Sequence, residues 1–238
     1  MESLKGKSVL VTGATGGIGA ATTRLLQAGG AQLFITGRNE MRLKALRDEL
    51  QLPADRYVAA DLSSAKEVEL LKERYYSVFP GMDILVNAAG VGIIKPMETL
   101  SVEDFMTTLQ ANLVAPFLLM KAFLPGMKEA KRGLIINIPG VLGKVPMAGA
   151  AAYTASKYGL NGMMQSIREE LKRTEIRITN LFLGGVDSPF WDQIDLRVQR
   201  DKMILVEEAA RSIWFLCQQP RSGVVSEMVL QPFNHQAI

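Results

Sequence analysis

The sequence predicts an α/β fold: one doubly wound parallel sheet of about seven strands, flanked by helices on both faces. Three observations support this prediction. Short apolar runs alternate with amphipathic stretches along the whole chain of 238 residues, and such β-α alternation implies parallel strands joined by right-handed crossovers. Several runs are continuously apolar, as in strands covered on both faces. Residues with special chemistry follow directly after strands, where ligands bind in such sheets.

A glycine-rich turn follows the first predicted strand, residues 7–11, and leads into a helix that ends near residue 28. The turn reads Gly13-x-x-x-Gly17-x-Gly19. Glycines let the backbone approach a ligand closely, and a helix N-terminus offers unpaired N–H groups and the positive end of a dipole. The turn therefore predicts a phosphate site, although its spacing differs from the best-known dinucleotide fingerprint. An ordinary glycine-rich turn is the alternative.

The rest of the chain continues the alternation of strands and helices. Further strands are predicted at residues 32–36, 57–60, 83–86, 134–138, 177–182 and 227–230, and further helices at 39–50, 63–78, 101–127, 152–173 and 206–218. No repeat, low-complexity segment or linker interrupts this pattern. Residues 1–238 are therefore expected to form a single domain.

Two of the predicted helices begin with recognisable caps. Ser63 or Ser64 starts the helix over 63–78, and Glu67 is placed as the capping-box partner of Ser64. Ser101 starts the long helix over 101–127, with an acidic residue in its first turn. This helix passes Pro116, where the missing amide N–H predicts a kink.

The composition is typical of a soluble globular protein, with 48% hydrophobic and 21% charged residues. The net charge of +3 and the pI near 9.0 raise the possibility of a nucleic acid or acidic partner. However, no Lys/Arg-rich block and no alternation of basic and aromatic residues is present. We therefore expect no nucleic-acid partner.

The cysteine and histidine counts restrict the chemistry that the chain can perform. One cysteine, Cys217, cannot form an internal disulfide, and its apolar helical context indicates buried packing rather than a nucleophile. One histidine, His235, makes a metal site or a Ser-His-Asp triad unexpected. The N-terminus has no signal-peptide core, and we expect no apolar run long enough to span a membrane. A cytoplasmic protein is the expectation.

Four segments together resemble the short-chain dehydrogenase/reductase family in order and spacing. They are Thr12-Gly13-Ala14-Thr15-Gly16-Gly17-Ile18-Gly19, Asn87-Ala88-Ala89-Gly90, Asn112 and Tyr153-Thr154-Ala155-Ser156-Lys157. Each segment alone is weak, but each lies at the end of the expected strand or on the expected helix, and the resemblance covers nearly the whole chain. It implies a Rossmann-like, dinucleotide-binding domain and an oxidoreductase that acts on a small-molecule carbonyl or alcohol.

The resemblance also implies a set of cofactor-binding residues. Asp61 matches the family's contact to the adenine amine, with a helix-cap or turn acid as the alternative role, and the segment from Asn87 would lie beside the nicotinamide-side ribose. The full set is Thr12, Gly13, Thr15, Gly17, Ile18, Gly19, Arg38, Asp61, Leu62, Asn87, Ala88, Gly90, Tyr153, Lys157 and Val186.

The end of the second strand favours NADP over NAD. NAD enzymes place an acid there for the ribose 2′-hydroxyl, whereas a nearby arginine suits the 2′-phosphate of NADP. Here Gly37 takes the place of the acid and Arg38 follows it, with Arg42 one helical turn further on. A guanidinium can form two charge-assisted hydrogen bonds to a phosphate. The alternative is that both arginines are solvated surface charges.

The catalytic residues implied by the resemblance are Tyr153, Lys157 and Asn112. Tyr153 and Lys157 are four residues apart on a helix and share one face. Tyr153 would donate a proton to the substrate carbonyl oxygen, and Lys157 would lower the pKa of Tyr153 and bind the cofactor ribose. Asn112 would hold a water that links Lys157 to solvent. An exposed lysine and a packed tyrosine are the alternative reading of this pair.

The chain departs from the family pattern at the position of the usual serine, thirteen residues before the tyrosine, where it has Gly140. Loss of one oxyanion donor typically lowers the rate by about 10²- to 10³-fold. A second departure is Gly184-Gly185, where Pro-Gly is usual, and it predicts a looser backbone. Two hypotheses follow: an NADP-dependent reductase without the serine, or a cofactor-binding protein with impaired catalysis that acts as a sensor, regulatory subunit or scaffold.

The segments around the expected site are largely apolar and suit an apolar or aromatic carbonyl compound, although simple packing explains them almost as well. They include Val91, Ile93, Ile94, Val141, Leu142, Met147, Phe190 and Trp191. Residues 188–202, called the lid segment below, resemble the family's mobile substrate lid. Family members often assemble through the helices that here contain Asn112 and Tyr153, which implies a homodimer or homotetramer.

Overall fold

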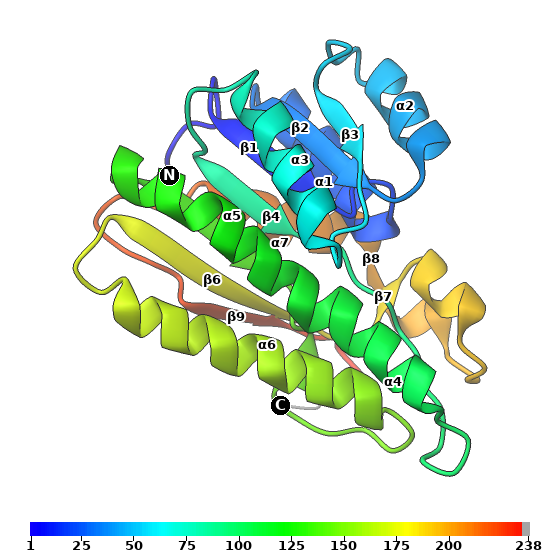
Figure 1. The fold of residues 1–238 in the computed structure, drawn as a ribbon. Coiled ribbons are helices and arrows are strands. Elements are labelled where there is room, and N and C mark those ends of the chain that lie inside the picture. The colour runs from blue at the N-terminus through cyan, green and yellow to red at the C-terminus, as the bar shows by residue number, and fades with distance from the viewer. Residues whose placement is uncertain (235–238) are drawn as a thin grey trace.

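A seven-stranded parallel sheet forms the centre of the computed structural model, which describes residues 1–234 (Figure 1). Its strands are β1 (Ser8–Thr12), β2 (Gln32–Gly37), β3 (Tyr57–Ala59), β4 (Ile84–Asn87), β5 (Gly133–Asn137), β6 (Ile176–Leu183) and β9 (Glu227–Leu230). The spatial order is β3-β2-β1-β4-β5-β6-β9, and every neighbouring pair is parallel. The strand order reverses at β1, so a crevice between β1 and β4 opens at their carboxyl ends.

Helices cover both faces of the sheet and divide the core into two clusters of buried residues. The helices are α1 (Gly17–Ala28), α2 (Glu40–Glu49), α3 (Ala65–Tyr76), α4 (Val102–Leu109), α5 (Ala115–Ala130), α6 (Ala151–Glu170) and α7 (Val206–Cys217). Residues of α1, α2 and α7 pack on one face, and residues of α3, α5 and α6 pack on the other. The structure thus confirms the doubly wound α/β prediction, and Cys217 is buried as expected.

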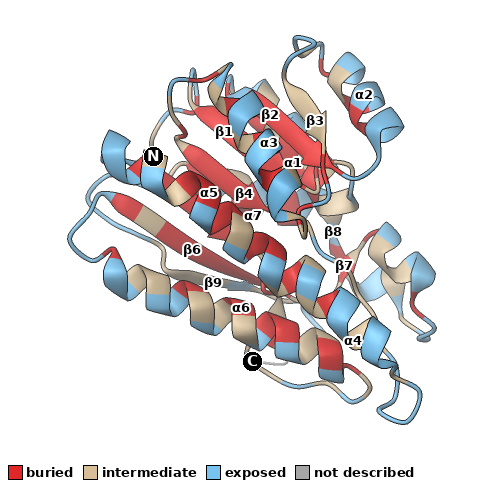
Figure 2. Cartoon of the chain, in the orientation of Figure 1, coloured by how far each residue is buried: buried red, intermediate tan, exposed pale blue. Residues whose placement is uncertain are grey.

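The central strands are buried along their whole length, as Figure 2 shows. In β1, β4 and β5 every residue is buried, whereas the edge strands β3 and β9 are only partly covered. Burial on both faces explains why the central strands read as continuous apolar runs in the sequence.

The long helix is irregular just before Pro116. A π turn over Gln110–Val114 separates α4 from α5, and the N–H of Ala115 bonds to the carbonyl of Gln110. Pro116 has no N–H to continue the regular pattern, and one residue is inserted into the turn before it. The interruption expected at the proline therefore lies one turn earlier and includes Asn112.

The same helical region, Val102–Ala130, is longer and more apolar than expected. An 18-residue window reaches a mean hydropathy of 1.2, which is enough by length and composition alone to cross a membrane. The expectation that no apolar run is long enough was therefore wrong. One side of α5 packs on the sheet through Leu119, Phe123 and Met127, which are at most 1% exposed. This is the pattern of a core helix.

The helix caps agree with the sequence at Ser101 and differ at Ser64. Ser101 Oγ accepts from the N–H of Asp104 at 3.0 Å, and the Asp104 carboxylate accepts from the N–H of Ser101 at 3.3 Å. Ser64 Oγ accepts from the N–H of Glu67 at 3.4 Å, but Glu67 accepts from the N–H of Asp61 at 2.6 Å. Ser64 is therefore the N-cap, but the predicted capping box is wrong. The preceding loop places the N–H of Asp61, and not that of Ser64, within hydrogen-bond distance of the Glu67 carboxylate.

The lid segment lies between two short parallel strands, β7 (Val186–Asp187) and β8 (Ile204–Leu205). Two 3₁₀ turns, Pro189–Gln193 and Arg200–Lys202, fold it over the carboxyl end of the sheet, as Figure 1 shows beside β7 and β8. Arg200 holds the segment together with three hydrogen bonds, to Asp187 at 2.6 Å, to Asp192 at 2.8 Å and to the carbonyl of Ser188 at 2.6 Å.

Candidate active site

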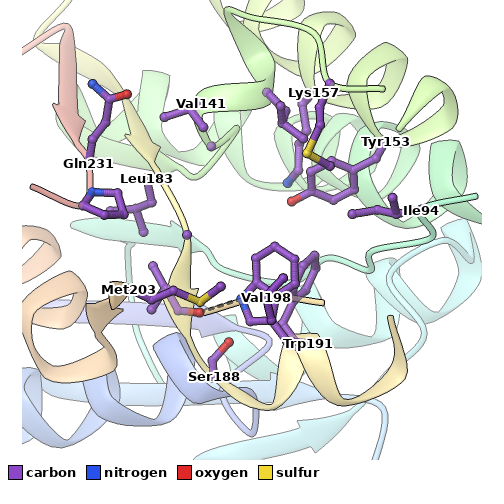
Figure 3. Close-up of a pocket in the computed structure, with 18 of the residues that line it drawn as sticks. Ile94, Val141, Tyr153, Lys157, Leu183, Ser188, Trp191, Val198, Met203 and Gln231 are labelled. Atoms are coloured by element: carbon purple, nitrogen blue, oxygen red, sulfur yellow. Dashed lines mark hydrogen bonds between the residues drawn. The ribbon is translucent and has the colours of Figure 1, made fainter. Parts of the chain in front are cut away.

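A cavity of about 750 Å³ opens at the carboxyl ends of the strands (Figure 3). Figure 3 shows Tyr153 and Lys157 on one wall and Ser188, Trp191 and Met203 on the opposite wall. Six of the expected site residues line it: Ile18, Ala88, Gly90, Tyr153, Lys157 and Val186. The cavity brings together the glycine turn, the segment after β4, α6 and the lid segment.

The walls of the cavity are mainly apolar. Of the expected apolar residues, the lining includes Ile94, Val141, Leu142, Met147, Phe190 and Trp191, and it leaves out Val91 and Ile93. Within residues 1–234 no Asp or Glu lines the cavity. Its polar side chains near α6 are those of Tyr153 and Lys157. Two basic residues of the lid segment, Arg197 and Lys202, also line the cavity. The cavity therefore combines mainly apolar walls with polar groups on α6 and basic side chains on the lid segment.

The glycine turn is built for close backbone approach. Gly13 has φ +61°, and a Cβ atom there would lie 2.7 Å from the backbone N and Cα of Ala89. A Cβ at Gly19 would lie 2.1 Å from the carbonyl oxygen of Gly13. No side chain caps the N-terminus of α1, which begins at Gly17. The first turn of α1 thus offers N–H groups to an anion, and a dinucleotide pyrophosphate fits this arrangement.

Two further expected cofactor residues, Thr12 and Asn87, lie below the surface of the site. Thr12 Oγ1 donates to the carbonyl of Val86 at 3.4 Å and accepts from the N–H of Ala89 at 3.3 Å, so it holds the end of β4 against β1. Asn87 donates to Asn137 at 2.8 Å, and its buried Oδ1 has no hydrogen-bond partner within the described chain. A buried acceptor of this kind calls for a donor from a water or ligand.

Arg38 and Asp61 lie at the carboxyl ends of β2 and β3. Arg38 is exposed and makes no hydrogen bond or ion pair with residues 1–234, so its guanidinium is available to a ligand. Asp61 accepts hydrogen bonds from the N–H and hydroxyl of Ser63, and these bonds, with the nearby Arg38 charge, lower the pKa of Asp61. Asp61 therefore stabilises this turn, and its contact to an adenine amine stays a prediction.

Thr15 and Leu62 differ in their access to a ligand. Thr15 Oγ1 lies 3.4 Å from the position of a Cβ at Gly37, so Thr15 is adjacent to the end of β2. Leu62 is 7% exposed and packs in the core cluster with α3. Its side chain contributes to packing rather than to the surface of the site.

Asn112 connects the segment after β4 to α6. Its Oδ1 accepts from the N–H of Val91 at 2.9 Å, and its Nδ2 donates to the carbonyl of Val91 at 2.9 Å and to Ser156 Oγ at 3.1 Å. Ser156 Oγ in turn donates to the carbonyl of Tyr153 at 2.7 Å. The π turn places Asn112 in this position, and the side chain holds the wall of the site together.

Tyr153 and Lys157 are neighbours on α6 but do not contact each other through the hydroxyl. Lys157 Nζ lies 5.3 Å from the centre of the Tyr153 ring and donates to the carbonyl of Ile138 at 3.0 Å. Burial raises the pKa of Tyr153 and lowers the pKa of Lys157 to about 8. Desolvation is the only cause of the raised pKa of Tyr153, so a lowering of that pKa by Lys157 stays a prediction.

The lowered pKa of Lys157 predicts a pH-dependent stability. The native pKa is about 8 and the reference value is 10.5. Between these values the unfolded chain binds more protons than the native chain, so stability rises with pH. The free energy of unfolding of the wild type should rise by about 2 kcal/mol relative to Lys157→Met between roughly pH 7 and 9.5. Urea unfolding of both proteins at the two pH values measures their free energies of unfolding. If the difference between wild type and Lys157→Met is the same at both pH values, the pKa of Lys157 is not lowered in the native protein.

Gly140, at the position where the sequence resemblance places a serine, has a backbone conformation of its own. It lines the cavity with φ +69° and ψ 170°, a conformation that favours glycine. A Cβ at this position would lie 3.4 Å from the carbonyl oxygen of Leu183. A serine side chain is therefore strained in the present backbone.

Gly140→Ser should destabilise the protein by about 1–3 kcal/mol, because a left-handed conformation strains any residue with a Cβ atom. This corresponds to a Tm lower by roughly 2–10 °C in a domain of this size. Thermal unfolding of Gly140→Ser and Gly140→Ala measures the effect. Both variants should lose stability equally, since the strain comes from the Cβ atom. A serine variant as stable as the wild type would show that the backbone rearranges at no cost.

Gly184 is also required by packing. A Cβ atom there would lie 2.6 Å from Pro232 Cδ, and its N–H donates to the carbonyl of Leu230 at 2.8 Å. The neighbouring Gly185 accepts from the N–H of Ile204 at 3.0 Å. Gly184 therefore allows the C-terminal segment to approach β6 closely, and the looser backbone expected at this pair stays a prediction.

Three further asparagines, Asn137, Asn161 and Asn180, form a chain of amides with the expected residue Asn87 and are absent from the sequence-based set. Asn137 accepts from Asn87 at 2.8 Å and donates to Asn180 at 3.5 Å, and Asn180 donates to Asn161 on α6 at 3.0 Å. Asn87, Asn137 and Asn180 are register partners on β4, β5 and β6. These asparagines could have been found from the sequence, because each is a polar residue within an otherwise apolar strand. The expected residue His235 lies outside the described residues.

Comparison with known proteins agrees with this geometry. Residues 7–198 match the family model of the short chain dehydrogenases. An uncharacterized oxidoreductase from Staphylococcus epidermidis is 30% identical over 98% of this chain and all of that protein. A metagenomic short-chain oxidoreductase in complex with NADP is 34% identical, with a TM-score of 0.84 over 98% of this chain and 100% of the other. An alcohol dehydrogenase from Thermococcus sibiricus, complexed with 5-hydroxy-NADP, is 26% identical with a TM-score of 0.88 over the same shares. The chain belongs to the short-chain dehydrogenase family and is an oxidoreductase of that family.

Proposed function

We propose that this chain is a cytoplasmic, NADP(H)-dependent oxidoreductase that reduces a carbonyl group, or oxidises the corresponding alcohol, of a small apolar substrate. The observation that carries the proposal is the position of Tyr153 and Lys157 on the wall of an apolar cavity that also includes the first turn of α1. A proton donor, a cation and a phosphate-binding turn then face one space.

The cofactor would be held by the chain from both ends of the crevice. The N-terminus of α1 would receive the pyrophosphate, and the segment from Asn87 to Gly90 would lie along the nicotinamide-side ribose. Lys157 would bind the ribose hydroxyls, since its Nζ lies 3.7 Å from the position of a Cβ at Gly90. When bound, NADPH supplies the hydride. Arg38, which makes no hydrogen bond or ion pair within residues 1–234, would bind the 2′-phosphate, and the NADP complexes of two similar proteins support this choice.

Tyr153 performs the proton transfer in this proposal. Its hydroxyl faces the cavity, as Figure 3 shows, and would donate a proton to the carbonyl oxygen. Asn112 keeps Tyr153 in place through Ser156, whose hydroxyl bonds to the Tyr153 carbonyl. Gly140 offers no side-chain donor to the developing oxyanion, so the phenol hydroxyl is the protein's main hydrogen-bond donor at that oxygen.

A second candidate function is a cofactor-binding protein with impaired catalysis, acting as a sensor, regulatory subunit or scaffold. The observation that favours it is the strained serine position: Gly140 has φ +69°, so the backbone itself departs from one that a serine would adopt easily. Tight NADPH binding without turnover is the expected behaviour in that case.

A homodimer or homotetramer is the proposed assembly. Exposed apolar side chains lie along the helices that carry Asn112 and Tyr153. They are Val102, Met106, Val114, Phe117 and Tyr158, each at least 37% exposed. Burying these side chains against a second copy would favour association.

The test is NADPH oxidation over a panel of ketones, aldehydes and quinones, with NADH as the control cofactor and NADPH binding followed by fluorescence. Turnover of an uncharged carbonyl at an ordinary rate, near 1–10³ s⁻¹ as a rough range, supports the reductase. NADPH binding without any turnover supports the second candidate. Absence of binding to either cofactor would contradict both.

A further inference from the structure

Phe190 occupies the space beside the Tyr153 ring. It belongs to the 3₁₀ turn Pro189–Gln193 of the lid segment, and the centres of the two rings are 5.9 Å apart with an angle of 60° between their planes. Both rings line the cavity. A molecule that places a carbonyl at the Tyr153 hydroxyl therefore has the Phe190 ring as a neighbour.

Gly92 makes room for this ring. A Cβ atom at Gly92 would lie 2.2 Å from Phe190 Cζ and 2.5 Å from Cε2. Real Cβ atoms do not approach this closely, so any other residue at position 92 would displace the ring or the loop. The ring is thus seated between the segment after β4 and α6.

The lid segment holds Phe190 from its other side. Trp191 packs its ring edge-on against Phe190 at 5.3 Å and 86°, and its Nε1 donates to the carbonyl of Val186 at 2.9 Å. Arg200 bonds to both flanks of the turn, at Asp187 and Asp192. Contacts with Tyr153, with Trp191 and with the segment at Gly92 therefore fix the position of Phe190.

We propose that Phe190, seated on Gly92, is a specificity-determining residue that makes the site prefer carbonyl compounds with an aromatic ring over saturated ones. This inference rests on the proposed function of the same site. A flat aromatic group can pack against the face or edge of Phe190, and aromatic pairs gain stability beyond the area they bury. A puckered saturated ring of equal size gains only the buried area. The gain corresponds to about a 2- to 10-fold preference.

The experiment compares acetophenone with cyclohexyl methyl ketone, which have the same number of carbon atoms and differ in ring planarity. The readout is the ratio of their kcat/KM values with NADPH in the wild type, Phe190→Leu and Gly92→Ala. Dividing by the wild-type ratio removes the different intrinsic reactivities of the two ketones. Phe190→Leu should lower the relative ratio about 2- to 10-fold, and Gly92→Ala should shift it in the same direction because the new methyl group displaces the ring.

A second readout does not depend on turnover. Calorimetry with the protein saturated with NADP gives the Kd of each ketone, and Phe190→Leu should weaken acetophenone selectively. Selective binding without turnover would overturn the proposed reductase and leave the role of Phe190 supported. An unchanged ratio in both readouts would overturn the role of Phe190. Phe215→Leu serves as the control, since Phe215 is 44% exposed on α7 and lies outside the cavity lining.

Discussion

Replacing Tyr153 with phenylalanine is expected to lower kcat/KM for carbonyl reduction by about 10²- to 10⁴-fold, the usual contribution of a positioned general acid. The phenyl ring keeps the contact with Phe190, whose ring centre is 5.9 Å away, so only the hydroxyl is lost. Because Gly140 supplies no side-chain donor, nothing in that position compensates. NADPH consumption in the steady state measures the effect, and fluorescence titration should show NADPH binding within a small factor of wild type.

Tyr158 provides a matched control on the same helix. It is 43% exposed, and its hydroxyl donates to the carbonyl of Lys144, away from the cavity lining. Tyr158→Phe should keep the wild-type kcat/KM. Equal activity of Tyr153→Phe and wild type would remove Tyr153 from the proton-transfer step, and an equal loss in both variants would indicate a general effect on α6.

Replacing Arg38 with glutamine should weaken NADPH binding by about 10- to 150-fold, because a hydrogen bond to a charged group contributes about 1.5–3 kcal/mol. NADH lacks the 2′-phosphate, so its affinity should change little. Arg38 is exposed and makes no hydrogen bond or ion pair within residues 1–234, so the substitution removes only its long-range attraction for Asp61. Fluorescence titration with both cofactors gives the two affinities.

Two further variants distinguish the contribution of Arg38 to cofactor binding from those of Arg42 and Gly37. Arg42→Gln tests the second arginine, whose backbone N–H bonds to Asn39 at the start of α2, and it should have a smaller effect than Arg38→Gln. Gly37→Asp with Arg38→Gln should move the preference towards NADH. A Cβ at Gly37 lies 3.4 Å from Thr15 Oγ1, an ordinary van der Waals distance, so this position has room for a Cβ atom. A loss of NADPH affinity in Arg42→Gln alone would assign the phosphate contact to Arg42.

The effect of Gly140 on catalysis depends on the protonation states of the buried residues Tyr153 and Lys157. Burial raises the pKa of Tyr153, which keeps its phenol neutral, and lowers the pKa of Lys157 to about 8, so Lys157 remains mostly protonated at neutral pH. A site without the serine hydroxyl depends more strongly on the phenol as a donor. The Tyr153→Phe and Gly140→Ser results together decide whether one donor is enough.

The sequence by itself determined the fold and the place of the site. Hydrophobic patterning is local, and the alternation of apolar runs with amphipathic stretches identified every strand of the main sheet. The spacing of Tyr153 and Lys157 placed both on one face of α6, because helical geometry needs no tertiary information. The glycine turn predicted close approach of a phosphate to the backbone, and this stays a prediction, whereas the close packing of Gly13 against the backbone of Ala89 is a feature of the fold.

Only the tertiary structure decided how distant segments meet. Asn112 bonds to Val91, Glu67 turns to Asp61 instead of Ser64, and Phe190 rests on Gly92. The left-handed backbone at Gly140 and the burial that raises the pKa of Tyr153 also come from packing. These features depend on loop paths and on side chains far apart in the chain, which no local period encodes, so their geometry follows from the folded core rather than from the pattern of residues.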